Sequence, residues 1–369
     1  MKSILFLSVM NGSAWGGSEE QWFRLALWMA KKKYDVAVSC FDWPEKAERL
    51  NALQNEGIKL FLLPKNNKGI IARWRLQKQV NKIHFEKYDL VFINQGGVKD
   101  ISHSPFKTIY KRCRKYVTSS HNYYEKGSLS YFKKSLLAKW FSNASLNIGD
   151  SQKIFDALQN KFNIHSANNK VVYNPIGFPY PEKINPFSTA NNNSVIFTML
   201  AALDVVRKAQ DVLINALSND KWKSRNWYLY LYGEGDDFEI LNSLIKHNKI
   251  DDKIFLKGHT DNVVSALNQS HLNLQITHID AMPISVVEAM ALSRPCIVSK
   301  VGDMPIWVQH EQNGYISSAI TVEAIDEVLE LAWHQKDKWS EMGEKSFAKF
   351  QELYPHPYEE NFVALLESL

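Results

Sequence analysis

The chain has 369 residues, of which 45% are hydrophobic and 22% are charged. This length exceeds one ordinary hydrophobic core, so we expect two domains. The composition excludes a disordered chain, and no apolar run reaches the roughly 18 residues that a membrane-spanning helix needs. Three scattered cysteines without metal-type spacing indicate a reducing, cytoplasmic location.

The net charge of +5 conceals an asymmetry between the two halves of the chain. Residues 1–185 carry 29 Lys and Arg against 14 Asp and Glu, which gives +15, whereas residues 186–369 carry 15 against 25, which gives −10. Such a division is expected if only the first half faces an anionic partner.

The first half alternates short apolar runs with helical patterns, which is typical of a parallel α/β domain. The N-terminal run is short and is followed at once by polar residues, so it predicts a first buried strand and not a signal peptide. The strands predicted in this half cover residues 3–9, 35–41, 58–64, 88–95, 115–121, 144–151 and 170–175.

A stretch rich in Pro, Asn and Ser, residues 174–194, separates this half from a second half with the same plan. The strands predicted there cover residues 194–203, 227–235, 252–258, 272–277 and 295–302, and a helix is expected to begin at residue 207. We therefore predict an N-terminal domain over residues 1–180, a linker over 181–193, a C-terminal domain over 194–352 and a C-terminal helix over 353–369.

The segment from Thr277 to Pro305 carries the clearest chemical signal. Asp280 and Glu288 stand eight residues apart, on either side of a helix that we expect to begin near residues 282–284. The backbone amides of residues 282–285 would then form an anion site, with phosphate as the usual anion. Two carboxylates flanking a phosphate site match the sugar hydroxyls, diphosphate and ribose hydroxyls of a nucleotide sugar. The alternative is a surface acid followed by a solvated helical acid.

Residues 280–291 read D-A-M-P-I-S-V-V-E-A-M-A. This stretch resembles the acid-x7-acid signature of retaining glycosyltransferases of family 4, E-G-F-P-[ILV]-x-x-x-E-A-M-A, with Asp in place of the first Glu and Ala-Met in place of Gly-Phe. The resemblance spans nearly the whole chain. It implies the GT-B fold, in which two doubly wound Rossmann-like domains face a cleft and a C-terminal helix crosses back to the first domain.

The resemblance also assigns roles around the signature. It implies that Asp280 holds hydroxyls of the donor sugar and that Glu288 holds the ribose hydroxyls. The residues that would then surround the donor diphosphate are Ala281, Met282, Pro283, Ile284 and Ser285.

A basic pair follows the strand at 194–203. The family's R-x4-K-G pattern binds the diphosphate, and Lys208 matches its second position, although Ala209 replaces the glycine. The first position falls on Leu203, which cannot serve. Arg207 is a candidate substitute because Arg grips phosphate with two N–H groups. A solvent-exposed basic helix start is the alternative for both residues.

Two glycine turns follow predicted strands. Gly16-Gly17 joins the first strand to the first helix without the dinucleotide fingerprint G-x-G-x-x-G, and a tight structural turn is the alternative explanation. With the family pattern GGSE, these residues are expected at the donor phosphates or sugar. Gly233 and Gly235 lie in a similar turn, where their backbone would admit the nucleotide.

His121 ends the strand at 115–121, at the carboxyl edge where α/β proteins bind ligands. A lone histidine is usually a satisfied structural group. The resemblance nevertheless places a histidine here beside the transferred sugar, so His121, Asp280 and Lys208 are the candidate catalytic residues. We predict no metal site, because Glu234 and Asp236 stand in a Gly-rich turn and His278 with Asp280 supplies too few ligands.

Residues 107–140 interleave Lys with Tyr, Phe, Trp and Leu. This make-up is typical of an interfacial amphipathic helix that binds anionic lipid headgroups. A solvated basic face packed on the core is the equal alternative. RNA is a weaker option, and no nucleic-acid partner is expected, because no recognisable motif accompanies the charge.

Taken with the resemblance, the sequence implies a metal-independent retaining transferase without a cofactor. It would move a hexose-type sugar from a UDP- or GDP-linked donor to a saccharide or lipid-linked saccharide acceptor, at a cytoplasmic or peripheral membrane location. A nucleotide-sugar epimerase or a glycan phosphorylase of the same architecture stays open. A non-catalytic, membrane-associated saccharide-binding protein also stays open, because Asp280, Ala281 and Leu203 depart from the family pattern.

Overall fold

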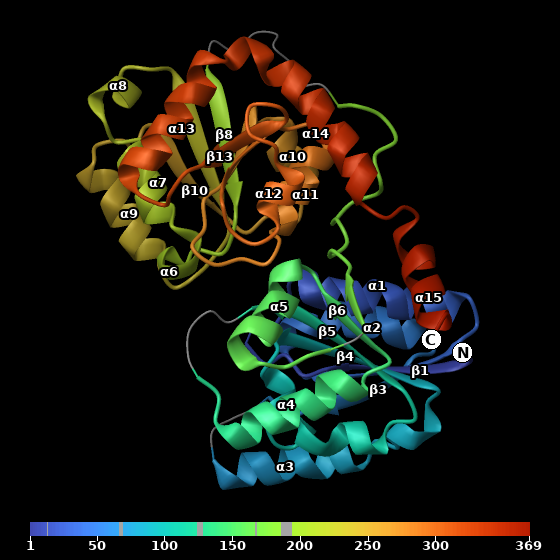
Figure 1. The fold of residues 1–369 in the computed structure, drawn as a ribbon. Coiled ribbons are helices and arrows are strands. Elements are labelled where there is room, and N and C mark those ends of the chain that lie inside the picture. Colours follow the sequence, from blue (N-terminus) through green and yellow to red (C-terminus); the bar gives the residue numbers. More distant parts are fainter. Residues whose placement is uncertain (13, 66–68, 124–127, 167, 186–193) are drawn as a thin grey trace. The chain divides into compact units, whose positions relative to one another are not determined.

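The computed structural model describes residues 1–12, 14–65, 69–123, 128–166, 168–185 and 194–369. They form two compact units: unit 1 contains Met1–Pro175 and Pro355–Leu369, and unit 2 contains Ile176–Tyr354. Each unit is a parallel sheet between helices, so the predicted α/β class is confirmed (Figure 1). The divisions observed at residues 175 and 354 lie close to the predicted limits at 180 and 352.

Unit 1 contains a seven-stranded parallel sheet in the order β3-β2-β1-β4-β5-β6-β7. Every residue of the central strand β4 is buried, as expected for a parallel sheet covered by helices on both faces. The strands are β1 (Ser3–Ser8), β2 (Asp35–Phe41), β3 (Lys59–Leu63), β4 (Leu90–Gly97), β5 (Tyr116–Asn122), β6 (Leu146–Gly149) and β7 (Asn169–Val171). The main helices are α1 (Gly17–Lys31), α2 (Ala47–Asn55), α3 (Ile70–Asn81), α4 (Tyr131–Asn143) and α5 (Gln152–Asp156).

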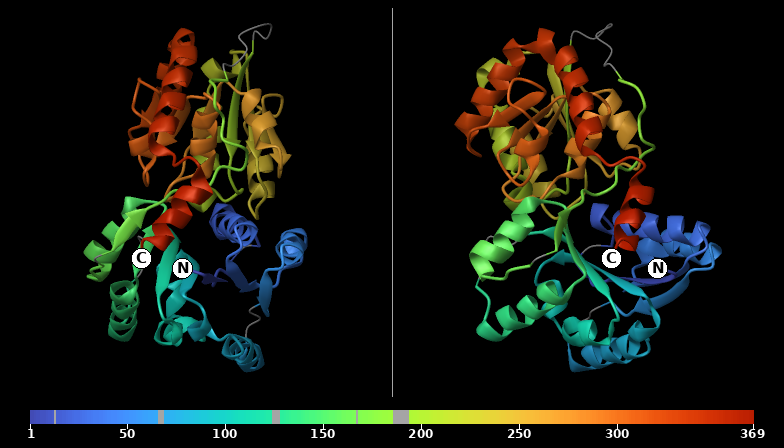
Figure 2. Two further views of the ribbon diagram at one scale, coloured as in Figure 1. Left: turned by 90° about the vertical axis from the view of Figure 1, so that its right-hand side faces the viewer. Right: turned by 45° about the vertical axis from the view of Figure 1, so that its right-hand side comes forward.

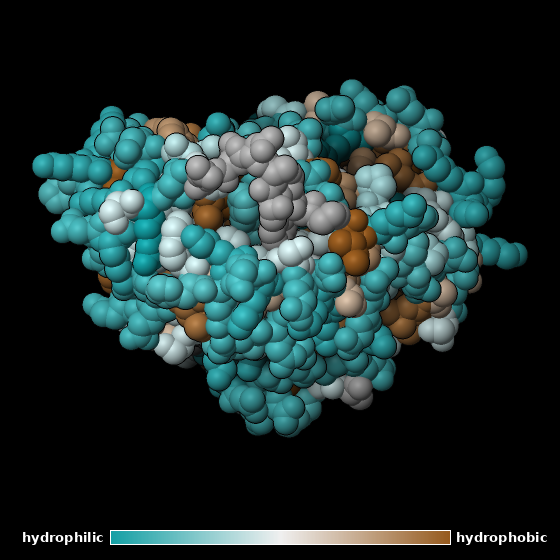
Figure 3. Space-filling model, turned by 90° about the horizontal axis from the view of Figure 1, so that it is seen from above, coloured by the Kyte–Doolittle hydropathy of each residue, from teal (hydrophilic) through white to brown (hydrophobic). Residues whose placement is uncertain are grey.

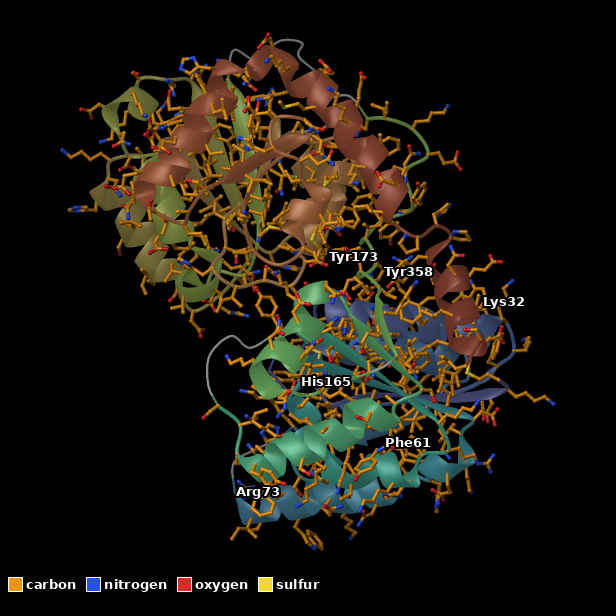
Figure 4. The ribbon with its side chains drawn as sticks, in the orientation of Figure 1. Lys32, Phe61, Arg73, His165, Tyr173 and Tyr358 are labelled. Atoms are coloured by element: carbon orange, nitrogen blue, oxygen red, sulfur yellow. The ribbon has the colours of Figure 1, made fainter. Side chains whose placement is uncertain are left out.

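The C-terminal helix α15 (Tyr358–Glu367) belongs to unit 1, which confirms the predicted return to the first domain. It packs beside α1 (Figures 1 and 2). The Tyr358 hydroxyl donates to the Tyr173 carbonyl oxygen over 2.8 Å (Figure 4), and Arg24 of α1 donates to Glu359 over 2.6 Å.

Unit 2 contains a six-stranded parallel sheet in the order β10-β9-β8-β11-β12-β13. Its strands are β8 (Val195–Leu200), β9 (Trp227–Tyr232), β10 (Ile254–Gly258), β11 (Leu272–Gln275), β12 (Cys296–Ser299) and β13 (Gly314–Ser317). Its helices are α6 (Val205–Lys208), α7 (Gln210–Ala216), α8 (Asp220–Lys223), α9 (Phe238–His247), α10 (Val263–Asn268), α11 (Ile284–Ala291), α12 (Met304–Trp307), α13 (Val322–His334) and α14 (Trp339–Leu353). On the face drawn in Figure 3, hydrophobic residues appear in small separate groups within a mainly hydrophilic surface.

The sequence did not predict two features of unit 2. Strand β13 was missed, and the helix expected from residue 207 is divided into α6 and α7. The division lies at Ala209, whose φ of 48° and ψ of 31° are left-handed and interrupt the right-handed helix. No helix in the described ranges is both long and apolar enough to cross a bilayer.

Candidate active site

Both sheets have the strand order of doubly wound nucleotide-binding folds. The direction of winding reverses between β8 and β11 in unit 2, and between β1 and β4 in unit 1. Ligands of such folds bind outside the carboxyl ends of the strands at this reversal. Most of the predicted site residues of unit 2 follow β8 and β11, so the topology brings together segments about 70 residues apart in sequence.

Lys208 and Asp280 form a direct ion pair at this reversal. The Lys208 ammonium group donates to Asp280 Oδ2, and both side chains are about five-sixths buried, with exposed fractions of 16% and 14%. Lys208 ends α6 after β8, whereas Asp280 lies in the loop between β11 and α11. Two of the three predicted catalytic residues are therefore in contact.

Backbone contacts hold these two segments in place. The Thr277 hydroxyl donates to the Arg207 carbonyl oxygen over 2.6 Å, and the His278 amide donates to the same oxygen over 2.8 Å. On the other side of the loop, the amide of Asp303 donates to the Ala281 carbonyl oxygen over 2.9 Å. The loop that carries Asp280 is thus fixed from both neighbouring strand ends.

Gly302 belongs to this support, although the sequence pattern did not single it out. Its φ of 56° is in the left-handed region, and a Cβ atom there would lie 2.0 Å from the Ala281 carbonyl oxygen and 2.5 Å from that of Asp280. Such distances cannot be reached, so only glycine allows this approach. Gly302 stands three residues after β12, and the local sequence gives no sign of this close approach.

Helix α11 begins at Ile284, within the predicted limits, and ends at Ala291 before Arg294-Pro295. Pro283 is its N-cap and has no N–H group, which corrects the prediction that all of residues 282–285 offer amides. The first-turn amides of Ile284 and Ser285 have no acceptor within the helix, so they can serve an anion. The Ser285 hydroxyl is already used, since it donates to Gln275 Oε1 over 3.1 Å.

Glu288 is buried on α11, with 5% of its surface exposed. Its Oε1 accepts a hydrogen bond of 2.8 Å from the Gly177 amide. Burial raises the pKa of this carboxyl from 4.5 to about 7, and the Gly177 hydrogen bond only partly opposes the rise. The solvated helical acid of the alternative explanation is therefore wrong, and a carboxyl with a strongly raised pKa is typical of a functional site.

Arg207 and Leu203 differ in their surroundings. The Arg207 side chain is half-exposed, and its Nε donates to Asp204 Oδ2 over 2.7 Å. Asp204 also caps α6 by accepting from the Arg207 amide, so the guanidinium is held beside the helix start but within reach of solvent. Leu203 is buried in the core, as expected of a residue that cannot bind phosphate.

Gly233 and Gly235 have a packing reason for being glycine. A Cβ at Gly233 would lie 1.9 Å from the Ala201 carbonyl oxygen, and one at Gly235 would lie 2.2 Å from that of Leu203. The turn after β9 therefore packs directly on the backbone that leads to α6. This contact explains both glycines without a ligand, and a role beside the nucleotide stays a prediction.

Gly16 and Gly17 begin α1 at the reversal in unit 1. Gly16 is extended, with φ near 173°, and a Cβ there would meet no atom within 4 Å. At Gly17 a Cβ would make only ordinary contact, 3.6 Å from Asn174. Among the described residues, internal packing does not require either glycine.

The start of α1 is anchored by a buried carboxylate, Glu19. It accepts from the Ser8 hydroxyl over 2.9 Å, from Asn94 Nδ2 over 3.1 Å and from the indole N–H of Trp22. Lys46 Nζ lies 2.7 Å from Glu19 Oε1, and neither side chain has any exposed surface. Glu19 thus ties the first turn of α1 to the last residue of β1 and to the neighbouring Asn94 of β4.

His121 is the second-last residue of β5 and lies within the same buried network. Its Nε2 lies 2.7 Å from Asn94 Oδ1, and its Nδ1 lies 3.4 Å from Asp150 Oδ2. Because Asn94 gives its amide N–H to Glu19, its oxygen faces the ring, and Nε2 is assigned as the protonated nitrogen. Asn94 and Asp150 were not predicted, yet they set the orientation of His121.

The remaining predictions concern metals and the membrane. Among the residues that the structure describes, no group of three His, Cys, Asp or Glu side chains could hold a metal ion, and Glu234 and Asp236 are exposed in their turn. The segment 107–140 is not one helix, because buried strand β5 runs through it and residues 124–127 lie outside the described ranges. Its Leu137 and Trp140 belong to the core.

Two family models match most of the sequence. Residues 15–177 match the model described as Glycosyltransferase Family 4, and residues 182–349 match the model of Glycosyl transferases group 1. The chain belongs to glycosyltransferase family 4. The resemblance inferred from the acid-x7-acid signature is thereby confirmed.

Curated relatives of this family 4 member match it over part of their length. The N-acetyl-alpha-D-glucosaminyl L-malate synthase of Bacillus anthracis is 31% identical over 119 residues, which is 32% of this chain and 31% of the relative. The poly(glycerol-phosphate) alpha-glucosyltransferase of Bacillus subtilis is 26% identical over 144 residues, which is 38% of this chain and 21% of the relative. The chain thus matches less than a third of the length of either relative.

Solved structures agree with the fold. The Anabaena protein HepE, solved in complex with UDP-glucose, superposes with a TM-score of 0.79 at 18% identity, over 100% of both chains. The TarM protein of S. aureus, solved with UDP, gives a TM-score of 0.72 at 12% identity, over 99% of this chain and 98% of that chain. The predicted GT-B fold is therefore confirmed.

Proposed function

We propose that this chain is a retaining glycosyltransferase that moves a hexose-type sugar from a UDP-sugar to a saccharide acceptor. The observation that carries the proposal is the Lys208–Asp280 pair, followed on the same loop and helix by the buried Glu288, at the reversal between β8 and β11. A lysine paired with one carboxylate, and a second carboxylate eight residues further along the same loop and helix, match the charge pattern of a nucleotide diphosphate sugar.

Each group of unit 2 would bind one part of the donor. Glu288 would accept hydrogen bonds from the ribose hydroxyls, and Asp280 would accept from hydroxyls of the sugar. Lys208 and Arg207 would neutralise the diphosphate, where charge develops as the bond to the sugar breaks. The amides of Ile284 and Ser285 and the backbone around Ala281 and Met282 would complete the phosphate site, and the turn with Gly233 and Gly235 would lie beside the nucleotide.

Unit 1 would supply the acceptor side. Gly16 and Gly17 would let the donor sugar or phosphate approach α1, and His121, oriented by Asn94 and Asp150, would lie near the transferred sugar. In the transfer itself, the bond between the sugar C1 and the phosphate oxygen breaks while C1 bonds to the acceptor oxygen on the same face. The acceptor proton passes to the leaving phosphate, so no protein nucleophile or metal is required.

The comparisons support the choice of donor and the retention of configuration. The HepE structure is described with UDP-glucose, and the Bacillus subtilis relative is named an alpha-glucosyltransferase. UDP-glucose carries its sugar in α linkage, so an α product from such a donor requires retention.

The proposal is tested by thermal shift with UDP, GDP and a panel of their sugars, followed by product analysis. A ligand at a hundredfold excess over its Kd stabilises by about 2.7 kcal/mol. We expect UDP-hexoses to stabilise the protein, and acceptor-dependent release of UDP with an α product to follow, unaffected by a chelator. Epimer formation from the donor alone, or phosphate-dependent release of a sugar phosphate from a glycan, would replace the proposal with one of the two related enzymes. Glu288→Ala is expected to abolish turnover in a folded protein, and wild-type turnover would remove Glu288 from the site.

A further inference from the structure

Helix α3 presents apolar side chains to solvent. Ile70, Ile71 and Trp74 are 85%, 69% and 60% exposed, whereas Leu76 and Val80 are buried and attach the helix to unit 1. Trp74 stands three residues after Ile71 and four after Ile70, and positions three and four apart are neighbours on one face of a helix. Leaving so much apolar surface in water is unfavourable, and grouped exposed residues of this kind mark interaction sites.

Cations surround this apolar face. Arg73, Arg75 and Lys78 of α3 are exposed, and the helix contains no acidic residue. Lys78 Nζ lies 5.2 Å from the centre of the Trp74 ring, so a charge and an aromatic side chain meet on the same face. Figure 4 shows Arg73 on α3 at the lower end of unit 1.

The first turn of α4 adds a second group of the same kind. Tyr131 and Phe132 are 81% and 84% exposed, and the next residue, Lys133, is also exposed. Figures 1 and 2 show α4 at the same lower end of unit 1 as α3. Two helices thus offer apolar tips among basic residues at one end of the unit.

We propose that this α3–α4 surface docks on an anionic lipid bilayer. The surface consists of Ile70, Ile71, Trp74, Tyr131 and Phe132 with Arg73, Arg75, Lys78 and Lys133. Projecting apolar and aromatic tips enter the boundary between headgroups and acyl chains, while neighbouring Lys and Arg side chains pair with anionic headgroups. The charge of +15 on residues 1–185 favours a negative surface over a neutral one.

The proposal relocates the predicted membrane contact and deepens the proposed function. The expected segment 107–140 contributes only its end at α4, and α3, outside that segment, provides three of the five exposed apolar side chains. Docking would place the transferase beside lipid-linked saccharides, which could then serve as its acceptors. Their role as acceptors rests on the proposed function. Docking itself does not require a donor or turnover and can be tested separately.

The test is flotation of the full chain with vesicles of phosphatidylcholine alone or with about one-third phosphatidylglycerol. We expect flotation with the anionic vesicles at about 0.1 M salt and loss of most of it at about 1 M, where the Debye length falls from about 10 Å to about 3 Å. The triple variant Ile70→Ser, Ile71→Ser, Trp74→Ser should bind at least about tenfold more weakly, because it loses buried apolar surface but no charge. Ile240→Ser, at a position 54% exposed on α9 of unit 2, is the matched control and should float like the wild type.

Two readouts keep docking separate from catalysis and from self-association. Stabilisation by UDP-sugar should be equal in the triple variant and the wild type, and its absence in both would count against the proposed function alone. Absent flotation at low salt, equal binding to neutral vesicles or equal binding by the triple variant would overturn the docking proposal. So would a dimer in solution that the same substitutions dissociate, since it would assign this surface to a second copy of the chain.

Discussion

The raised pKa of Glu288 predicts that the proposed nucleotide site lowers the stability of the fold. We consider Glu288→Gln, which keeps the shape of the side chain and an oxygen for the Gly177 amide but cannot ionise. Because burial raises the pKa of Glu288 from 4.5 to about 7, the folded chain retains a proton between these values that the unfolded chain releases. Stability therefore falls as the pH rises from about 4.5 to about 7 and stays low above that range.

The size of this loss follows from the pKa difference. Each unit of difference corresponds to about 1.4 kcal/mol, so ionisation of Glu288 lowers the free energy of unfolding by about 3 kcal/mol at pH 8. The Gln variant avoids this loss. It should be more stable than the wild type by up to about 3 kcal/mol at pH 8 and nearly equal to it at about pH 4.5.

Binding should move in the opposite direction. A carboxylate accepts from two ribose hydroxyls with charge assistance, and loss of such a bond costs about 1.5–3 kcal/mol, or roughly 10–100-fold in affinity. For the wild type, the Kd of a UDP-sugar should be about tenfold higher at pH 6 than at pH 8, because only about a tenth of Glu288 is ionised at pH 6. In the Gln variant this dependence on pH should disappear.

The assay compares thermal unfolding of both proteins at about pH 4.5 and at pH 8. Each protein is also titrated with a UDP-sugar at pH 6 and pH 8, a range in which the diphosphate of the ligand does not titrate. Comparing the variant with the wild type at both pH values of each measurement cancels effects of the substitution that do not involve ionisation. A Gln variant that is no more stable at pH 8, or a wild-type Kd that is constant between pH 6 and pH 8, would refute the reasoning.

Three further substitutions test the supports of the site. Ala209→Gly should stabilise unit 2 by about 1 kcal/mol, because the left-handed φ of 48° strains alanine, and a lowered Tm in thermal unfolding would contradict this. Gly302→Ala should lower the affinity for UDP-sugar at least about tenfold in a binding titration, because a backbone oxygen lies 2.0 Å from the added Cβ and the loop must move. Gly258→Ala is its control, with φ at 70° but open space, and should cost stability without costing affinity. Asn94→Leu removes the partner of His121 Nε2, so we expect a kcat at least about tenfold lower with unchanged UDP affinity, and an unchanged kcat would exclude a positioning role.

Most of the fold could be predicted from the sequence because buried parallel strands are continuous apolar runs. Strand β2 over Asp35–Phe41 matches the predicted limits, and the others differ by a few residues. Strand β13 could not be predicted, because four residues reading GYIS carry no periodicity. The break at Ala209 was also missed, since an alanine gives no local sign of a left-handed backbone.

In the candidate site, too, local patterns could be predicted from the sequence and contacts between distant segments could not. Asp280 and Glu288 could be predicted because both lie on one loop and helix, where spacing alone fixes their separation. The contact of Lys208 with Asp280 depends on the order β8-β11 in the sheet, and the supports at Gly302 and Asn94 depend on close approach between separate segments. Local sequence patterns carry no information about such approaches.

The excess of basic residues in the first half of the chain does not by itself locate a binding surface. Lys46 is fully buried against Glu19, and Arg24 pairs with Glu359 of α15, so these cations act within the fold. Helix α3, in contrast, has exposed cations, no acidic residue of its own and a row of exposed apolar side chains. An anionic bilayer can satisfy both features at once, whereas a purely electrostatic partner leaves the apolar side chains in water. The apolar residues of α3, more than the net charge of the first half, therefore decide what kind of partner this surface suits.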